Sequence, residues 1–184
     1  MSAYLATHAA ANEAAMLALE ASRGDACVRA DTSAVYQLTG ADAAAAASWT
    51  RRIGLAAIVA AAAELRTAAA EMASVRVDGA MRYQGERYES DQEREFPRWA
   101  NDRLVDADAD GNAIVPANVL LAALLETDSI LAADRVERQS ARHDGVTSQG
   151  ADGLQESYGG EERDLCRDAW RLMERYLLTT GSIR

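Results

Sequence analysis

Alanine supplies much of the apolar content of this chain, and this limits the core that the chain can build. Hydrophobic residues make up 49 % of the 184 residues, but aromatic residues make up only 5 %. Alanine favours helices by intrinsic propensity, yet it buries little area per residue. The composition therefore predicts a mainly α fold with a thin core, which favours partner subunits that complete it.

The charge argues against nucleic-acid binding. The formal net charge is −10, and all 19 basic residues are arginines. Because DNA binding needs cationic side chains that neutralise phosphates, an acidic chain is a poor candidate. No apolar run reaches the length of a membrane span, and the first residues lack the basic region of a secretion signal. We therefore expect a protein that is made inside the cell and has no membrane partner.

The first 50 residues have the pattern of a small module that precedes a larger helical domain at residues 51–184. Residues 12–22 predict a short helix. Two strand-like runs at residues 26–30 and 34–38 are separated by three polar residues, which predicts a β-hairpin. We expect Trp49 to fold back onto this hairpin.

Three helical patterns follow, at residues 53–72, 116–136 and 161–178. Each places apolar residues three and four positions apart, as the buried stripe of a helix requires. Residues 140–160 have the composition of a flexible loop, with a strand or hairpin as the alternative. The expected architecture is a bundle of about three to four long helices with the hairpin as an N-terminal addition.

An acidic segment matches the first half of a calcium-binding loop. Asp106, Asp108 and Asp110 alternate and are followed by Gly111. However, Ala117 stands where such a loop needs a bidentate glutamate. The sequence favours a solvated acidic turn over a calcium site.

No pattern for catalysis, a cofactor or a metal is found. His8 and His143 have no Cys or carboxylate ligand at helical spacing. Cys27 and Cys166 are far apart, and two buried or semi-buried thiols are favoured over a disulfide or a reactive thiol. We find no glycine-rich phosphate loop and no nucleophile elbow. The chain is therefore expected not to be an enzyme.

Arginine and tyrosine alternate at residues 82–88. Such side chains can stack on bases, but the surrounding acidic residues offset the charge. Contacts between subunits suit the mixture better, since both residue types are favoured at interfaces. The candidate intersubunit residues are Arg82, Tyr83, Arg87, Tyr88, Phe96, Arg98, Trp99, Val146 and Tyr158.

Residues 56–176 resemble the head–tail connector (adaptor) proteins of tailed phages and prophages, a family sometimes labelled DnaT-like. The resemblance is an ordered series of short segments at residues 57–72, 83–87, 91–92, 96–99, 108–111, 114–116, 145–148, 153 and 157–158, closed by a helix that carries leucine and tyrosine. The first fifty residues lie outside it, although their hairpin pattern is similar to a module of phage structural proteins.

The resemblance implies a structural virion protein in a homo-oligomeric, typically dodecameric ring between portal and tail. Its partners would be the portal protein and a tail terminator, stopper or other neck protein, with DNA passing through without specific binding. It also implies a location at the head–tail junction of the virion, and in the host cytoplasm during assembly. The candidate portal-docking residues are Tyr176, Leu177, Leu178, Thr179, Thr180, Gly181, Ser182, Ile183 and Arg184.

Two other interpretations remain open. One is a different neck or tail structural protein, such as a stopper, terminator or completion protein. The other is a nucleic-acid-associated accessory protein, which the acidic charge disfavours.

Overall fold

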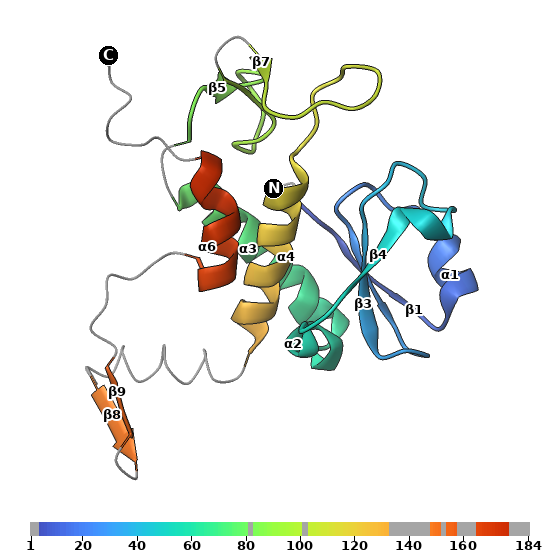
Figure 1. The fold of residues 1–184 in the computed structure, drawn as a ribbon. Coiled ribbons are helices and arrows are strands. Elements are labelled where there is room, and N and C mark those ends of the chain that lie inside the picture. Colours follow the sequence, from blue (N-terminus) through green and yellow to red (C-terminus); the bar gives the residue numbers. More distant parts are fainter. Residues whose placement is uncertain are drawn as a thin grey trace.

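A mixed four-stranded sheet lies beside a group of helices, with α1 (Glu13–Leu17) on the other face of the sheet (Figure 1). The computed structural model describes residues 4–80, 83–100, 103–132, 148–151, 154–157 and 165–176. The strands run in the order β1 (Thr7–Ala10), β2 (Ala26–Arg29), β3 (Ala34–Leu38) and β4 (Trp49–Arg52). β1 and β2 are parallel and joined through α1, whereas the other two pairs are antiparallel.

The predicted mainly α bundle is wrong. The predicted hairpin exists, with Arg29 opposite Ala34, but it forms the centre of a wider sheet. Trp49 folds back as predicted and pairs with Leu38 at the start of β4. The sequence of β1, Thr-His-Ala-Ala, lacks a strand pattern, so its pairing with β2 rather than its own propensity makes it a strand.

Two helices replace the single one predicted at residues 53–72. They are α2 (Ala56–Ala60) and α3 (Ala63–Gly79). Ala61 and Ala62 between them are extended, with ψ values of 150° and 156°. The Asp128 carboxylate accepts a hydrogen bond from the Ile58 N–H at 3.0 Å, so a long-range contact holds α2. Tertiary contacts here override the helix propensity of the alanines.

The buried face of α3 differs from the predicted one. The spacing of apolar residues at 53–72 places Leu65 on the buried stripe, but its side chain is 60 % exposed. The buried residues are instead Arg66, Ala69, Ala70, Ala73, Ser74 and Val77. Small side chains let two helix backbones approach closely, and this face packs on α4 (Ala117–Leu131).

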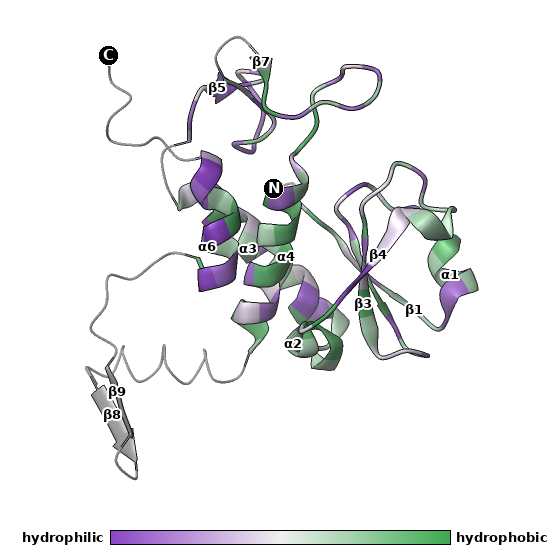
Figure 2. Cartoon of the chain, in the orientation of Figure 1, coloured by the Kyte–Doolittle hydropathy of each residue, from purple (hydrophilic) through white to green (hydrophobic). Residues whose placement is uncertain are grey.

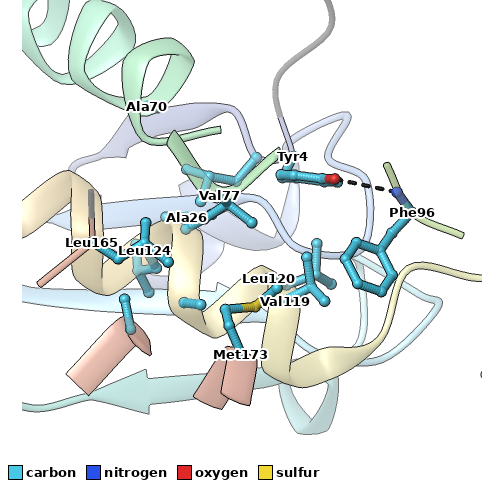
Figure 3. Packing of buried hydrophobic residues seen from close by; sticks show 14 of the residues in the cluster. Tyr4, Ala26, Ala70, Val77, Phe96, Val119, Leu120, Leu124, Leu165 and Met173 are labelled. Carbon is cyan, nitrogen blue, oxygen red and sulfur yellow. Dashed lines mark hydrogen bonds between the residues drawn. The ribbon is translucent and has the colours of Figure 1, made fainter. Parts of the chain in front are cut away.

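α4 lies between α3 and α6 (Arg167–Met173) and is the most apolar of the three helices (Figures 1 and 2). Figure 3 shows Leu120 and Leu124 of α4 packed with Val77 of α3 and Met173 of α6. α6 begins later than predicted because Cys166 is extended, at ψ 157°. The spacing of apolar residues in this helix predicts one buried face of five residues, of which Leu165, Ala169 and Met173 are buried and Leu172 and Tyr176 are partly buried.

Short elements complete the described chain. β5 (Glu86–Arg87), β6 (Arg98–Ala100) and β7 (Arg103–Leu104) form a second sheet in a region predicted to be irregular. β8 (Ser148–Ala151) and β9 (Leu154–Ser157) form the hairpin that was the alternative to a loop. The 3-10 turns η1 (Ala46–Ser48) and η2 (Glu174–Tyr176) precede β4 and follow α6. Within the described residues, no helix is long and apolar enough to cross a membrane.

One hydrophobic cluster contains residues of both predicted domains. Leu5, Ala26 and Val35 from the N-terminal 50 residues pack with Ile58 and Leu124. A smaller cluster on the other face of the sheet contains Ala10, Met16, Cys27, Leu38 and Trp49. The division at residue 50 stays a prediction.

An ion pair between α3 and α4 gives the first testable prediction. Arg76 Nη1 donates to Glu126 Oε1 at 2.9 Å, and the Glu126 side chain is fully buried. Arg76→Met leaves this buried carboxylate without the arginine cation. We expect the free energy of unfolding to fall by about 3 kcal/mol, measured by urea denaturation.

Arg171→Met is the matched control, because Arg171 lies 3.8 Å from Asp168 in an exposed pair. Its expected effect is about 0.3 kcal/mol. Equal losses for the two variants would contradict a stabilising role for the buried pair.

Candidate nucleic-acid interface

Two adjoining pockets lie at one end of the four-stranded sheet, where the β2–β3 turn meets α2. The first has a volume of about 290 Å³ and is lined by β3, β4 and α2, and the second, of about 560 Å³, by β1, β2 and the α2–α3 link. They share Ser33 and Val59, and together they are termed the arginine groove. The remaining lining residues are Ala34, Val35, Arg51, Arg52, Ile53, Gly54, Leu55, Ala56 and Ala60 in the first pocket, and Ala9, Ala10, Ala11, Val28, Arg29, Ala30, Ala61 and Arg66 in the second.

The arginine groove contains four arginines and, within the described part of the chain, no acidic lining residue. Such a surface is unusual on a protein with a net charge of −10. Its apolar residues are mostly small, which leaves room beside the guanidinium groups. The groove therefore combines positive charge with open apolar surface.

Arg52 is held by a neutral partner. Its Nε and Nη2 donate to Gln37 Oε1 at 3.0 and 2.8 Å. Gln37 is buried, and its Nε2 donates to the carbonyl oxygens of Gly24 and Leu120, both at 3.2 Å. Burial lowers the pKa of Arg52, because a partly desolvated guanidinium has no carboxylate beside it. Arg52 thus keeps a fixed position and an uncompensated charge.

Arg51 lies next to Arg52 on the edge strand and is exposed. Among the described residues it has no ion pair and no side-chain hydrogen bond. Ile53, directly after it, is 89 % exposed. β4 is largely hydrophilic along its length in Figure 2. Arg51 and Ile53 thus offer a free cation and an apolar side chain at the rim of the groove.

The second pocket contains two arginines in different electrostatic states. Arg29 donates to Glu13 at 3.0 Å and to Asp31 at 2.8 Å, and these bonds, chiefly that to Asp31, raise its pKa. Its guanidinium also lies over the Tyr36 ring, 4.8 Å from the centroid. Arg66 is only 7 % exposed, yet its Nε has no hydrogen-bond partner within the described ranges. The charge of Arg29 is compensated, and that of Arg66 is not.

The predicted intersubunit residues divide into buried and exposed groups. Tyr83 and Phe96 are in the core with ring centroids 5.0 Å apart, and Arg98 is buried and donates to the Gln84 carbonyl at 2.9 Å. Tyr88 and Trp99 stack at 5.8 Å, and each is 39 % exposed. An intersubunit role stays a prediction for all of them.

The remaining predicted site residues are described only in part. Arg87 is at the surface and pairs with Glu95. Of the portal-docking candidates, Tyr176 is described, with its ring 5.3 Å from that of Phe96. The residues not described are Arg82, Val146, Tyr158, Leu177, Leu178, Thr179, Thr180, Gly181, Ser182, Ile183 and Arg184.

Asp108 organises the acidic segment as a turn. Its carboxylate accepts hydrogen bonds from the N–H groups of Asp110 at 3.0 Å and Asn112 at 2.8 Å, and from Asn112 Nδ2 at 3.0 Å. These bonds, led by that from the Asn112 side chain, lower the pKa of Asp108. In the ranges that the structure describes, no three His, Cys, Asp or Glu side chains gather as metal ligands would. Both carboxylate oxygens of Asp108 therefore accept hydrogen bonds within the turn.

The groove could not be predicted from the net charge of the whole chain. Residues 1–62 carry four arginines against five carboxylates, which is a net −1 of the total −10. The pair Arg51-Arg52, followed by an isoleucine, was the local signal. No local sequence signal marked Arg66 as a site residue, because its burial depends on the break between α2 and α3.

The fold and the groove define a small α/β protein with an arginine-lined concave surface. Residues 35–180 match a family model described as "putative DnaT-like ssDNA binding protein". Because the match covers most of the chain, the protein belongs to this DnaT-like family. No curated protein and no solved structure gave a significant match.

This match corrects the predicted identity. A phage head–tail connector in a dodecameric ring is wrong as the main interpretation, because the family is described by ssDNA binding. The predicted portal, stopper and terminator partners are wrong for the same reason. So is the prediction that DNA passes through without specific binding. Only the DnaT-like label of the resemblance is confirmed, and its span widens from residues 56–176 to 35–180. The location in a virion stays an untested prediction.

The thiols provide a prediction on reactivity. Cys27 is fully buried, and burial raises its pKa to about 11, so at pH 8 only about one molecule in a thousand carries the thiolate. We expect iodoacetamide to modify Cys27 at least about a hundredfold more slowly in the native protein than in urea. Cys166 is partly exposed and should react sooner. Mass spectrometry of the two cysteine peptides measures both rates, and equal native and denatured rates for Cys27 would contradict its burial.

Proposed function

We propose that this protein binds single-stranded DNA and acts as a DNA-associated accessory protein. The observation that carries the proposal is the pair of uncompensated arginines, Arg51 and Arg52, in a groove without acidic lining residues. Both lie inside the range that matches the DnaT-like family. The family description supplies the class of ligand, and the groove supplies a place for it.

Different residues of the groove would contact the phosphate and the base of a nucleotide. Guanidinium groups neutralise and hydrogen-bond phosphates, which gives affinity without sequence preference. Arg51, at the rim of the groove, would contact the phosphate backbone of the DNA, and Arg52 would offer a second, fixed cation. The exposed Ile53 offers an apolar contact to a base, which only a single strand presents freely.

The stacked pair of Tyr88 and Trp99 is a second aromatic surface of the kind on which bases stack. Acidic residues flank it, and Arg87 beside it is already paired with Glu95. This surface therefore offers a base stacking but little charge neutralisation.

Net charge does not prevent this function. The Debye length is about 8 Å at physiological ionic strength, so distant carboxylates are largely screened from a phosphate in the groove. The same carboxylates should keep the affinity modest and the salt dependence shallow, because few phosphates are neutralised. We also propose that the protein works by binding alone, without turnover.

Binding of a fluorescein-labelled oligo(dT) strand, followed by anisotropy at low salt, tests the proposal. We expect wild-type protein to bind the strand and to prefer it to a duplex of the same length. Arg51→Glu should weaken binding by about tenfold and reduce the slope of log K against log salt by about 0.7. Arg51 has no partner within the described structure, so the variant should fold normally.

Arg171→Glu is the charge-matched control, because it changes the net charge equally on α6, outside the groove. It should bind within about twofold of wild type. If wild-type protein fails to bind the strand at low salt, or if both variants lose affinity equally, the proposal is wrong.

A further inference from the structure

We propose that the second pocket of the arginine groove is a phosphate site, in which the Arg66 guanidinium holds the anion near the start of α3. The phosphate would come either from a DNA backbone or from free phosphate. The inference rests on the proposed function only in the first case.

The state of Arg66 is the first argument. Its side chain is more than nine-tenths buried, it lines the pocket, and its Nε lacks a hydrogen-bond partner in the part of the chain described. No carboxylate among the described residues forms an ion pair with it. A buried charge without a partner is strongly unfavourable, and buried polar groups are nearly always hydrogen-bonded. An external anion would remove this cost.

The neighbouring carboxylates do not serve this purpose. Glu13 and Asp31 both form ion pairs with Arg29, the other arginine of this pocket. Glu64, on the same turn as Arg66, is exposed and does not line the pocket. Arg66 therefore remains the cation that an incoming anion would meet.

The start of α3 is the second argument. This helix is 17 residues long, and no side chain caps its N-terminus at Ala62. The first N–H groups of a helix lack intrahelical partners and favour anions. Ala61, just before the helix, and Arg66, its fourth residue, line the pocket, whereas the residues between them do not. The helix start therefore lies near the cleft, and its field favours an anion there, although Glu64 in the first turn opposes it.

The size and shape of the cleft fit such a ligand. Its volume of about 560 Å³ is open to solvent, and most of its other lining side chains are alanines. These leave space for a tetrahedral group and for the chain or nucleoside attached to it. A guanidinium presents a planar fork of donors, which matches phosphate oxygens better than an ammonium does.

Thermal unfolding in phosphate and in chloride, at matched ionic strength, tests the site with wild type and Arg66→Met. We expect phosphate to raise the Tm of wild type by about 4 °C at a concentration tenfold above its Kd. Arg66→Met should show no phosphate-specific rise, while general salt effects act equally on both proteins. In chloride this variant should unfold at the same or a higher temperature, since it removes an unpaired buried charge.

Oligo(dT) binding to the same two proteins identifies the source of the phosphate. A weaker affinity in Arg66→Met assigns the site to the DNA backbone, whereas unchanged affinity together with the lost Tm shift assigns it to free phosphate. Arg66→Lys, which keeps the charge without the fork, should retain part of the shift.

Equal behaviour of wild type and Arg66→Met in both measurements would overturn this inference while leaving the proposed function intact. Conversely, a phosphate shift that depends on Arg66 in a protein that binds no DNA would refute the proposed function alone.

Discussion

Gln37 is the side chain on which the arrangement of sheet, helices and groove depends. It projects from β3 and is 1 % exposed. Its amide donates to the Gly24 and Leu120 carbonyls, and its oxygen accepts two bonds from Arg52. All four bonding positions of the amide are therefore used. A buried network of this kind specifies one arrangement, because any shift of α4 against the sheet would leave a buried polar group unpaired.

The same hydrogen-bond network holds the Arg52 guanidinium in the groove, a position that the sheet alone would not impose. Arg52 lies on the edge strand and would otherwise turn to solvent or to a surface carboxylate. Gln37 orients the guanidinium without neutralising it, since an amide oxygen carries no formal charge. Arg51 needs no such support, because it is exposed. Arg51 and Arg52 leave opposite faces of β4, and both line the first pocket. An anion bound by both would order only the Arg51 side chain, because Arg52 is already fixed.

Local patterns predicted the parts of the fold that local forces control. Polar residues between two strand-like runs indicated the β2–β3 hairpin, and the spacing of Leu165, Ala169 and Met173 gave the buried face of α6. β1 and the break at Ala61 and Ala62 depend on distant contacts, to β2 and from Asp128 to Ile58. The buried face of α3 was mispredicted because most of its buried residues are small, whereas the larger Leu65 and Met72 are exposed. The net charge of the chain led to the prediction against nucleic-acid binding. It misled because it averages over a surface on which acidic and basic residues lie in different regions.

Several departures from local rules occur together between α2 and α3. The helical pattern breaks between α2 and α3, the second helix starts without a side-chain cap, and Arg66 follows buried without a partner. Natural sequences keep such conflicts few, and where they persist they tend to mark sites that serve function rather than stability. An unbroken helix through these alanines would satisfy local propensity better. It would also remove the free helix start beside Arg66, and so the break itself creates the surroundings in which this arginine can meet an anion.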